Sequence, residues 1–493
     1  MKSIIITNPD KEKLFGHLLR NKHQENIAAL FCGYNSFDGN LQLLVKNVWL
    51  INDDGLTVHT GASLEFSEQM HRKILLKCDE LKTSLFIAHS HPFSDSAWFS
   101  SVDDTNDKMQ ARFISKHLPD IYYGNLVVAQ KDYKARLFNK KKNIFEEIKK
   151  IKILGKFNSE TIAKNEPELD RNYRAFGKQG QAVISQLKIA LVGCGGLGWQ
   201  IGPQLVGVGA RNILLVDYDT IEITNLNRLP GAPFSCVGKY KAKVLAKLLR
   251  KMNHKVNVKY LIANVSESKV CEELKKCDII IGALDSEKAR SDVNKFSAQY
   301  LKIYLDAGSG ILLENGKVKH AGGQVNVIIP GSSPCLTCNN SLDWKMVLYE
   351  SMDKKEQDIE VKRGYIQGVS EPAPSVVSIN GVVASTLVNE FLALTTGLRK
   401  PNYYTYYDFM NDKNLMFTMD VKKNDNCVVC SKDALFGYGD VVKENKKTEK
   451  LPTFIREDYY DTRRIFSDFK QVKSTRHKSD KIHIAGTRIR AKC

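Results

Sequence analysis

The stretch that decides the fold runs over residues 187–241 and contains LKIALVGCGGLGWQ (187–200), NILLVDYDTIEITNLNR (212–228) and VGKYK (237–241). Its first apolar run, 187–192, is typical of a buried parallel strand. Gly193, Gly195 and Gly198 follow in GxGxxG spacing, ahead of a helix-like segment, and a second apolar run, 212–216, ends in Asp217. This order predicts a nucleotide-binding α/β unit, because glycines let the backbone approach phosphates, a helix N-terminus favours their negative charge and the acid can hold a ribose hydroxyl.

Polar residues after the second strand separate ATP chemistry from a dehydrogenase. Asn225, Arg228 and Lys241 follow it closely, whereas a dehydrogenase needs a hydride acceptor and an acid-base group instead. The transition state of adenylation is crowded with negative charge, which fixed cations stabilise. A third apolar run begins at Ile279 and leads to Asp285, at the sheet edge where ligands bind in such folds and where a carboxylate can hold Mg²⁺.

With these residues, positions from about 170 to 430 resemble the ThiF/MoeB-type adenylating domain of ubiquitin-activating enzymes. The resemblance implies ATP and Mg²⁺ as cofactors and an Arg174 that reaches the phosphates of a homodimer partner. It implies nucleotide binding by the glycines, Asp217 and Asp219, phosphate binding by Asn225, Arg228 and Lys241, and magnesium binding by Asp285; Arg290 also matches. An ordinary Rossmann fold with solvated basic residues stays open as the alternative.

Two CxxC pairs support the same interpretation. Cys335 with Cys338 and Cys427 with Cys430 can supply four thiolates to one tetrahedral zinc ion. Such a closed site is structural, and the long gap between the pairs means that it would join distant segments. Adenylating domains of the resembled family often carry such a zinc. A redox or incidental role for each pair is the alternative.

The remaining cysteines offer no obvious thioester nucleophile. Many enzymes of the resembled family carry one between the zinc pairs, but the corresponding stretch here, 368–375, reads GVSEPAPS. A thioester step at that position is therefore not expected. Of the 11 cysteines, we expect five in the core and two as candidate reactive thiols. The five are Cys32, Cys78, Cys194, Cys271 and Cys277, and the two are Cys236 and Cys493.

A second candidate site lies in the first 150 residues. The apolar run 85–88 predicts a strand that leads into His89-Ser-His91-Pro92, and alternate residues of a strand share a face. With the carboxylate of Asp103, His89 and His91 make a three-ligand zinc site that stays open to water. Ser100 is spaced to hold a developing oxyanion, and Glu25, ahead of the apolar run 27–32, is the candidate general base.

This pattern resembles the JAMM (MPN-type) metalloprotease family of deubiquitinating and related isopeptidases. The resemblance covers Glu25, His89, His91, Ser100 and Asp103 and implies a catalytic zinc. The gap between His91 and the serine is slightly longer than in the family, so Ser101 with Asp104 stays open as another register. A histidine pair on a surface strand, or a metal-free relative of the fold, also stays open.

Composition bounds the class of protein. The chain is 43% hydrophobic and 26% charged, and its 493 residues predict two or three domains. No apolar run approaches the ~18 residues of a membrane span, the N-terminal apolar stretch is too short for a signal peptide, and CxxC pairs with free thiols favour the cytoplasm. The net charge of +18 favours a solvated lysine-rich surface, or a basic face for an acidic protein, over nucleic-acid binding.

We therefore expect an α/β protein of two domains. Residues 1–150 form a JAMM/MPN-type α/β domain, 151–168 a linker, and 169–433 a Rossmann-like adenylating domain with a largely parallel sheet and a structural zinc. Residues 434–493 form a basic tail. The lysine-rich segment 139–152 is predicted to be a basic helix near the domain joint, and 482–484 a short strand.

Coupling of the two sites indicates the function. An adenylating domain activates the C-terminus of a ubiquitin-like protein, and a JAMM-type protease exposes that terminus or removes the conjugate. One chain with both resembles prokaryotic ubiquitin-like modification systems, some of them linked to antiviral (phage) defence, with a conjugating enzyme as a further partner. Activation of a sulfur carrier for cofactor or metabolite biosynthesis is one alternative. A regulatory scaffold that binds ubiquitin-like proteins is another.

Overall fold

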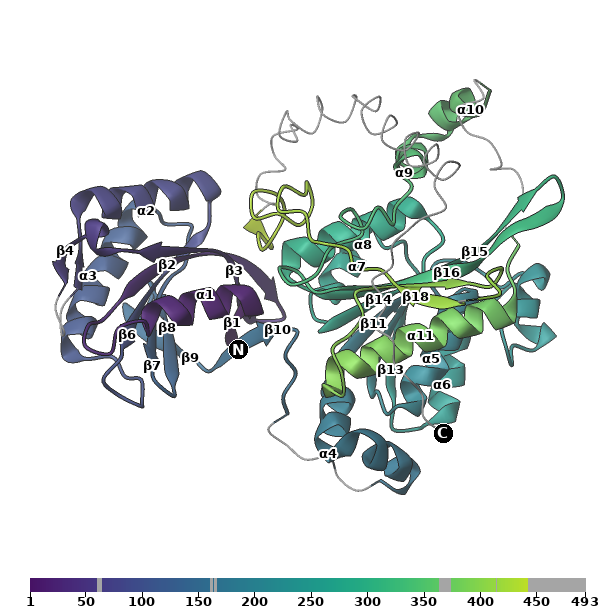
Figure 1. Ribbon diagram of the computed structural model, residues 1–493, viewed down its shortest axis with the longest axis horizontal. Coiled ribbons are helices and arrows are strands. Elements are labelled where there is room, and N and C mark those ends of the chain that lie inside the picture. Colours follow the sequence, from purple (N-terminus) through teal and green to yellow (C-terminus); the bar gives the residue numbers. More distant parts are fainter. Residues whose placement is uncertain (60–63, 160–162, 164–165, 363–373, 414, 442–493) are drawn as a thin grey trace. The chain divides into compact units, whose positions relative to one another are not determined.

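The computed structural model describes residues 1–441 except 60–63, 160–162, 164–165, 363–373 and 414. The predictions for 482–484 and Cys493, and most of the stretch 368–375, lie outside the described residues. Within the described part, two eight-stranded mixed sheets each carry helices on both faces, and one small hairpin adds two strands (Figure 1). The predicted α/β class is therefore confirmed.

The first sheet has the order β10-β1-β3-β2-β6-β7-β8-β9. Its strands β1, β3 and β10 run parallel, as do β6 and β7, and the other neighbours are antiparallel. The elements of this part are β1 (Lys2–Thr7), α1 (Asn8–Leu18), β2 (Ile27–Phe37), β3 (Asn40–Ile51), η1 (Asp53–Gly55), β4 (Leu56–His59), β5 (Leu64–Phe66), α2 (Glu68–Leu81), β6 (Ser84–His91), α3 (Ser101–His117), β7 (Tyr123–Ala129), β8 (Tyr133–Asn139), β9 (Ile144–Ile148) and β10 (Lys150–Leu154).

Helices cover both faces of this sheet, so its central strands are buried on both sides. Helix α1 packs Leu14 and Leu18 into one apolar cluster, while α2 and α3 pack Ile74 and Ile114 into the cluster on the other face (Figure 1). All eight residues of β6 are buried. A central strand of this kind holds its C-terminal residues in a fixed position, which matters because β6 ends at His91.

The segment 139–152 is not the basic helix that its charge suggested. It forms the end of β8, then β9 and the start of β10. The prediction was wrong because β-branched isoleucines such as Ile148, Ile151 and Ile153 fit a buried or half-buried pleated surface, and the lysines between them do not prevent strand pairing. Strand β10 pairs with β1 as far as Leu154 and so extends this sheet into the predicted linker.

The second sheet has the order β13-β12-β11-β14-β15-β16-β17-β18. The first five strands are parallel to their neighbours and the last three are antiparallel additions, so the sheet is mixed and parallel in its Rossmann-like half. The elements are η2 (Pro167–Leu169), α4 (Asp170–Gln186), β11 (Lys188–Val192), α5 (Gly196–Gly207), β12 (Asn212–Val216), η3 (Ile223–Arg228), η4 (Phe234–Cys236), α6 (Lys241–Met252), β13 (Asn257–Leu261), α7 (Ser268–Leu274), β14 (Ile279–Gly282), α8 (Glu287–Tyr300), β15 (Ile303–Glu314), β16 (Lys317–Ile328), α9 (Trp344–Ser351), α10 (Lys354–Lys362), α11 (Val377–Thr396), β17 (Tyr404–Asp408) and β18 (Met416–Thr418).

Two apolar clusters sandwich the second sheet. Helices α4, α5, α6 and α11 pack on one face and α7 and α8 on the other (Figure 1). Of the described helices, α11 alone has the length and apolar composition of a membrane span. Asn380 and Glu390 interrupt its apolar residues in the sequence, while Leu387 and Phe391 are fully buried in the cluster with α5. These contacts make α11 a core helix of the sheet.

The segment 432–441, which we call the return segment, follows the last CxxC pair and packs against β2 and β3. The ammonium of Lys46, which is fully buried, donates to the carbonyls of Ala434 (3.3 Å) and Phe436 (3.1 Å). Phe436 packs with Leu44, and a Cβ on Gly33 would lie 2.1 Å from a backbone carbonyl oxygen of the segment. The predicted tail, 434–493, thus begins with residues that are part of the folded structure.

Candidate functional site

The glycine loop joins β11 to α5 as the sequence predicted. Gly193 has a φ of +91°, and a Cβ there would lie 2.3 Å from the carbonyl oxygen of Ala283. A Cβ on Gly198 would lie 1.9 Å from the carbonyl oxygen of Gly193, so both positions require glycine. Gly195, by contrast, faces open space at the N-terminus of α5, where backbone N–H groups are available to a phosphate.

Asp217 and Asp219 follow β12 and lie beside this loop. The carboxylate of Asp217 accepts the backbone N–H of Cys194 (2.7 Å) and of Asp219 (2.8 Å). Burial raises the pKa of Asp217, although these two hydrogen bonds act in the opposite direction. The ammonium of Lys241, the first residue of α6, lies 2.8 Å from the carboxylate of Asp219. The predicted ribose-binding acid and the predicted phosphate-binding lysine are therefore brought to one edge of the sheet.

Asn225 and Arg228 reach the same place through the 3₁₀ helix η3. Asn225 is buried and its side-chain oxygen accepts the backbone N–H of Glu222 at 3.3 Å. The Arg228 guanidinium donates to the carbonyl of Thr224 at 2.8 Å. The Arg228 side chain also lies against Gly196 of the glycine loop, 3.2 Å from where a Cβ would be. The side chain of Arg228 thus lies beside the glycine loop.

Three other residues of the resemblance have different surroundings. Asp285 is exposed after β14, at the carboxyl edge of the sheet. Arg174 is exposed on α4 and pairs with Asp170 at 2.9 Å, and its role toward a second subunit stays a prediction. Arg290 is buried and binds the carboxylate of Asp306 at 2.7 Å, which is a structural role inside the core.

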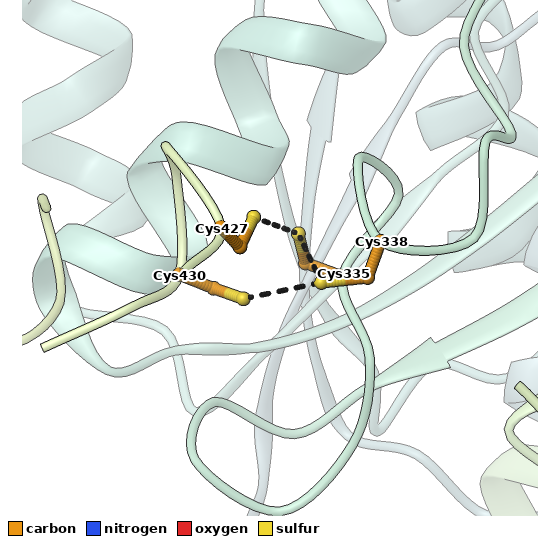
Figure 2. Close-up of side chains that lie close together, drawn as sticks. All are labelled: Cys335, Cys338, Cys427 and Cys430. Carbon is orange, nitrogen blue, oxygen red and sulfur yellow. Dashed lines mark hydrogen bonds between the residues drawn. The ribbon is translucent and has the colours of Figure 1, made fainter. Parts of the chain in front are cut away.

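The four cysteines of the two CxxC pairs converge, as Figure 2 shows. Sulfur–sulfur distances are 3.8 Å for Cys335 to Cys338, 3.7 Å for Cys335 to Cys427 and 3.6 Å for Cys338 to Cys430. Disulfide sulfurs lie about 2.05 Å apart, whereas four sulfurs around one zinc at about 2.3 Å each lie roughly 3.8 Å apart. The donor set and spacing fit a structural zinc, beside the α7–α8 face of the sheet.

The other described cysteines are not exposed. Cys32, Cys78, Cys194 and Cys277 are buried, and Cys271 is half-buried, as expected of small core residues. The candidate reactive thiol Cys236 is also buried.

The second candidate site gathers at the C-terminal end of β6. Nε2 of His89 lies 3.4 Å from Oδ1 of Asp103, and Nε2 of His91 lies 3.8 Å from Oδ2 of Asp103 and 3.6 Å from Glu25. Both histidines are buried, which rules out a pair on a surface strand. Asp104 instead pairs with Arg136, so the geometry favours Asp103 over the Ser101–Asp104 register.

This cluster fits a zinc ion. Two ligand atoms each bound at about 2.0–2.1 Å in a tetrahedron lie roughly 3.4 Å apart, close to the histidine–carboxylate distances found here. Nε2 of His89 is buried, and its 3.4 Å contact with the Asp103 carboxylate does not have the geometry of a hydrogen bond, as expected of two atoms that bind one metal. Glu25 lies 3.6 Å from His91 but is not one of the three clustered residues, and its role as a general base stays a prediction.

The pKa values of this cluster shift in different directions. Burial lowers the pKa of His89, but the neighbouring carboxylates of Asp103 and Glu25 outweigh it and raise that pKa above its usual value. Burial raises the pKa of Glu25 to about 7, with His89 acting against the rise and Asp103 adding to it. Burial would also raise the pKa of Asp103, but the contacts with His89 and Ser100 outweigh it and hold that pKa below its usual range. Burial lowers the pKa of His91, which keeps the imidazole neutral and able to bind a metal.

Ser100 begins α3 and forms a capping box with Asp103. Its hydroxyl donates to the Asp103 carboxylate (2.8 Å) and accepts the backbone N–H of Asp103 (3.1 Å). In this arrangement the serine fixes the position of the Asp103 carboxylate, and its role toward an oxyanion stays a prediction. Arg136 binds the same helix and was not predicted, because the acids that follow Asp103 are its only local signal in the sequence.

The fold and the loop residues define a Rossmann-like domain with a glycine loop, basic side chains beside it and a Cys₄ cluster. Comparison with known families matches residues 169–429 to the ThiF family, and the chain belongs to this family.

Similar proteins are E1-like activating enzymes. Over 257 residues the chain is 29% identical to ubiquitin-like modifier-activating enzyme 5 of Gallus gallus, covering 50% of this chain and 59% of that protein. Over 205 residues it is 30% identical to adenylyltransferase and sulfurtransferase MOCS3 of Culex quinquefasciatus, covering 40% and 45%. The chain thus spans about half of the length of these relatives. A crystal structure of E. coli MccB with ATP is 21% identical with a TM-score of 0.43, covering 54% and 75%.

Proposed function

We propose that the ThiF domain adenylates the C-terminal carboxylate of a ubiquitin-like protein. The observation that carries the proposal is the convergence of Asp217, Arg228 and Lys241 on an open glycine loop, in a chain that belongs to the ThiF family. The relatives named above support a protein carboxylate as the acceptor.

The proposed reaction follows from these positions. A carboxylate oxygen of the carrier attacks the α-phosphorus of ATP, the bond to the β-phosphate breaks, and pyrophosphate leaves. Asp217 holds the ribose, and Arg228 and Lys241 stabilise the charge that develops on the phosphates. Asp285, exposed at the sheet edge, is the residue that would hold Mg²⁺.

Pyrophosphate exchange tests this proposal. The purified chain should exchange labelled pyrophosphate into ATP only when a ubiquitin-like protein with a free C-terminus is added, and a carrier that lacks its last residue should give none. Exchange without any carrier, or equal exchange with the truncated carrier, would refute it.

We propose further that the N-terminal domain is a zinc-dependent peptidase or isopeptidase of the JAMM type that acts on the same carrier. The observation behind it is the cluster of His89, His91 and Asp103 with Glu25 beside it. A zinc ion held by these residues would lower the pKa of a water molecule. Glu25 would take a proton from that water as its oxygen attacks the scissile carbonyl carbon, and would deliver the proton to the amine that leaves when the C–N bond breaks. Ser100 would help to hold the tetrahedral oxyanion.

Trimming of an extended carrier tests the peptidase. The wild-type chain should remove a C-terminal extension, while Glu25→Gln and His91→Ala should not. Adenylation of a carrier that is already trimmed should stay intact in both variants, which makes it the internal control. If Glu25→Gln trims at the wild-type rate, Glu25 is not the base.

Activation of a sulfur carrier is the second candidate function, because one similar protein is an adenylyltransferase and sulfurtransferase. Two measurements distinguish sulfur-carrier activation from activation of a ubiquitin-like modifier. One is which carrier protein supports pyrophosphate exchange. The other is the product formed from the carrier adenylate, which is a thiocarboxylate in the first case and an amide-linked conjugate in the second. A chain that binds the carrier without exchange or trimming would be a regulatory scaffold.

A further inference from the structure

Arg136 of β8 is a buried cation held from four sides. Its guanidinium pairs with Asp104 and, at 2.7 Å, with Asp107. The same group lies 3.7 Å from the ring centroid of Phe99 and 4.3 Å from that of Phe145. A planar guanidinium suits both the two carboxylates and the two ring faces, whereas a lysine ammonium does not.

These contacts surround the third proposed ligand. Asp104 directly follows Asp103 on α3, and Asp107 lies one helical turn further on the same side. Phe99 directly precedes Ser100, which caps the helix. Arg136 therefore holds the chain on both sides of Asp103.

The sheet places Arg136 on the face that carries the histidines. Arg136 pairs with Asn125 of β7, and Asn125 pairs with Ile87 of β6, two residues before His89. Laterally paired residues of a sheet share a face, as do alternate residues of one strand. Arg136 thus links the strand frame of the histidines to the helix that carries the carboxylate.

Burial makes this link costly to lose. The Asp107 side chain is only 15% exposed, and removing one partner of a buried ion pair leaves the other as an uncompensated charge. The carboxylate then gains by moving toward water, which shifts the first turn of α3 away from β6. Asp103, the first-turn residue, moves with it.

We propose that Arg136 is a positioning residue for the N-terminal metal site, one that sets the distance from Asp103 to His89 and His91 by clamping the start of α3. This inference rests on the proposed function of that site. Its consequence is measurable in zinc binding itself: loss of a residue that orients a metal ligand typically weakens metal affinity about 10–100-fold.

The test is zinc competition with a graded series of chelators on the full chain. Wild type should hold two zinc ions, and Arg136→Met, which keeps a side chain between Phe99 and Phe145, should weaken one of them by about 10–100-fold while the Cys₄ zinc stays. The zinc affinity of Arg136→Lys should fall between those of wild type and Arg136→Met, since lysine keeps the charge but lacks the planar guanidinium that binds two carboxylates. Arg112→Met, a change on the same helix that removes a contact with Asn143, is the matched control and should bind like wild type.

A double variant separates positioning from general destabilisation. Asp107→Asn in the Arg136→Met background removes the uncompensated charge, so it should recover part of the zinc affinity. If Arg136→Met does not fold, Arg136→Lys and the double variant carry the same comparison.

Wild-type zinc affinity in folded Arg136→Met or Arg136→Lys would overturn the inference. If wild type binds two zinc ions but does not remove the C-terminal extension of the carrier, the peptidase proposal is refuted. The role of Arg136 in zinc binding is then still tested by the affinities of its variants. A single zinc ion in wild type that Cys335→Ser releases would overturn both, because the histidine site would then hold none.

Discussion

Lys241→Ala is the sharpest test of the adenylation site. The Lys241 side chain is 13% exposed, so its charge is poorly screened from a phosphate bound at the glycine loop. Removing one preorganised donor of this kind typically costs about 2.7–4 kcal/mol of transition-state stabilisation, which is roughly a 100- to 1000-fold loss in rate. We expect a loss of that size in carrier-dependent pyrophosphate exchange.

Stability should change far less than activity. The partner of Lys241 in the free protein, Asp219, is nearly half exposed, and ion pairs of that kind contribute at most about 1 kcal/mol. The melting temperature of Lys241→Ala should therefore stay close to that of wild type.

Lys243→Ala is the matched control for this change. Lys243 is exposed on the same helix, two positions further along, and should exchange at the wild-type rate. If Lys241→Ala exchanges as fast as Lys243→Ala, the lysine does not act on the phosphates and the reasoning fails.

Three further predictions concern the metal, the assembly and the pH dependence. Cys335→Ser should release one zinc ion and lower the melting temperature, as measured by metal analysis and calorimetry; a stable variant with full zinc content would show that the cysteines do not share it. Arg174→Ala should lower pyrophosphate exchange if the chain is a homodimer. A chain that is a monomer by light scattering and exchanges pyrophosphate at the full rate would contradict a role of Arg174 in a second subunit. Burial lowers the pKa of Lys302 from 10.5 to about 8, so the unfolded chain binds more protons than the folded chain between those pH values and the free energy of unfolding should rise with pH there. Lys302→Met should lose that rise in thermal melts, and an unchanged slope would refute the assignment.

Local patterns made much of the nucleotide site predictable. The glycine loop, the two flanking strands and Asp217 are close in sequence, and their geometry follows from backbone sterics at Gly193 and Gly198. The Cys₄ cluster was also predictable, because each pair carries its own spacing. The glycine loop and the Cys₄ cluster are predictable because closely spaced glycines and CxxC pairs have few other structural roles.

The features that the sequence could not predict depend on contacts between residues that lie far apart along the chain. In the sequence, Arg136 resembles any charged residue on the surface of a strand. Its contacts with α3 and with two aromatic rings exist only in the folded structure. Likewise, Lys46 is a lone lysine whose carbonyl acceptors lie near the other end of the described chain. The misprediction of 139–152 has a related cause, since its isoleucines find their strand partners in β8 and β1.

The return segment makes the chain fold back on its own beginning. Residues that follow the last CxxC pair complete the environment of Lys46 and Leu44, which belong to the first sheet. A fragment that ends in the linker would expose a buried ammonium and an apolar surface to water, and a protease cut in the linker would leave two pieces that still adhere. Moving the first domain into another protein would therefore require the return segment as well, because that segment supplies the acceptors of the buried Lys46 ammonium and covers Leu44.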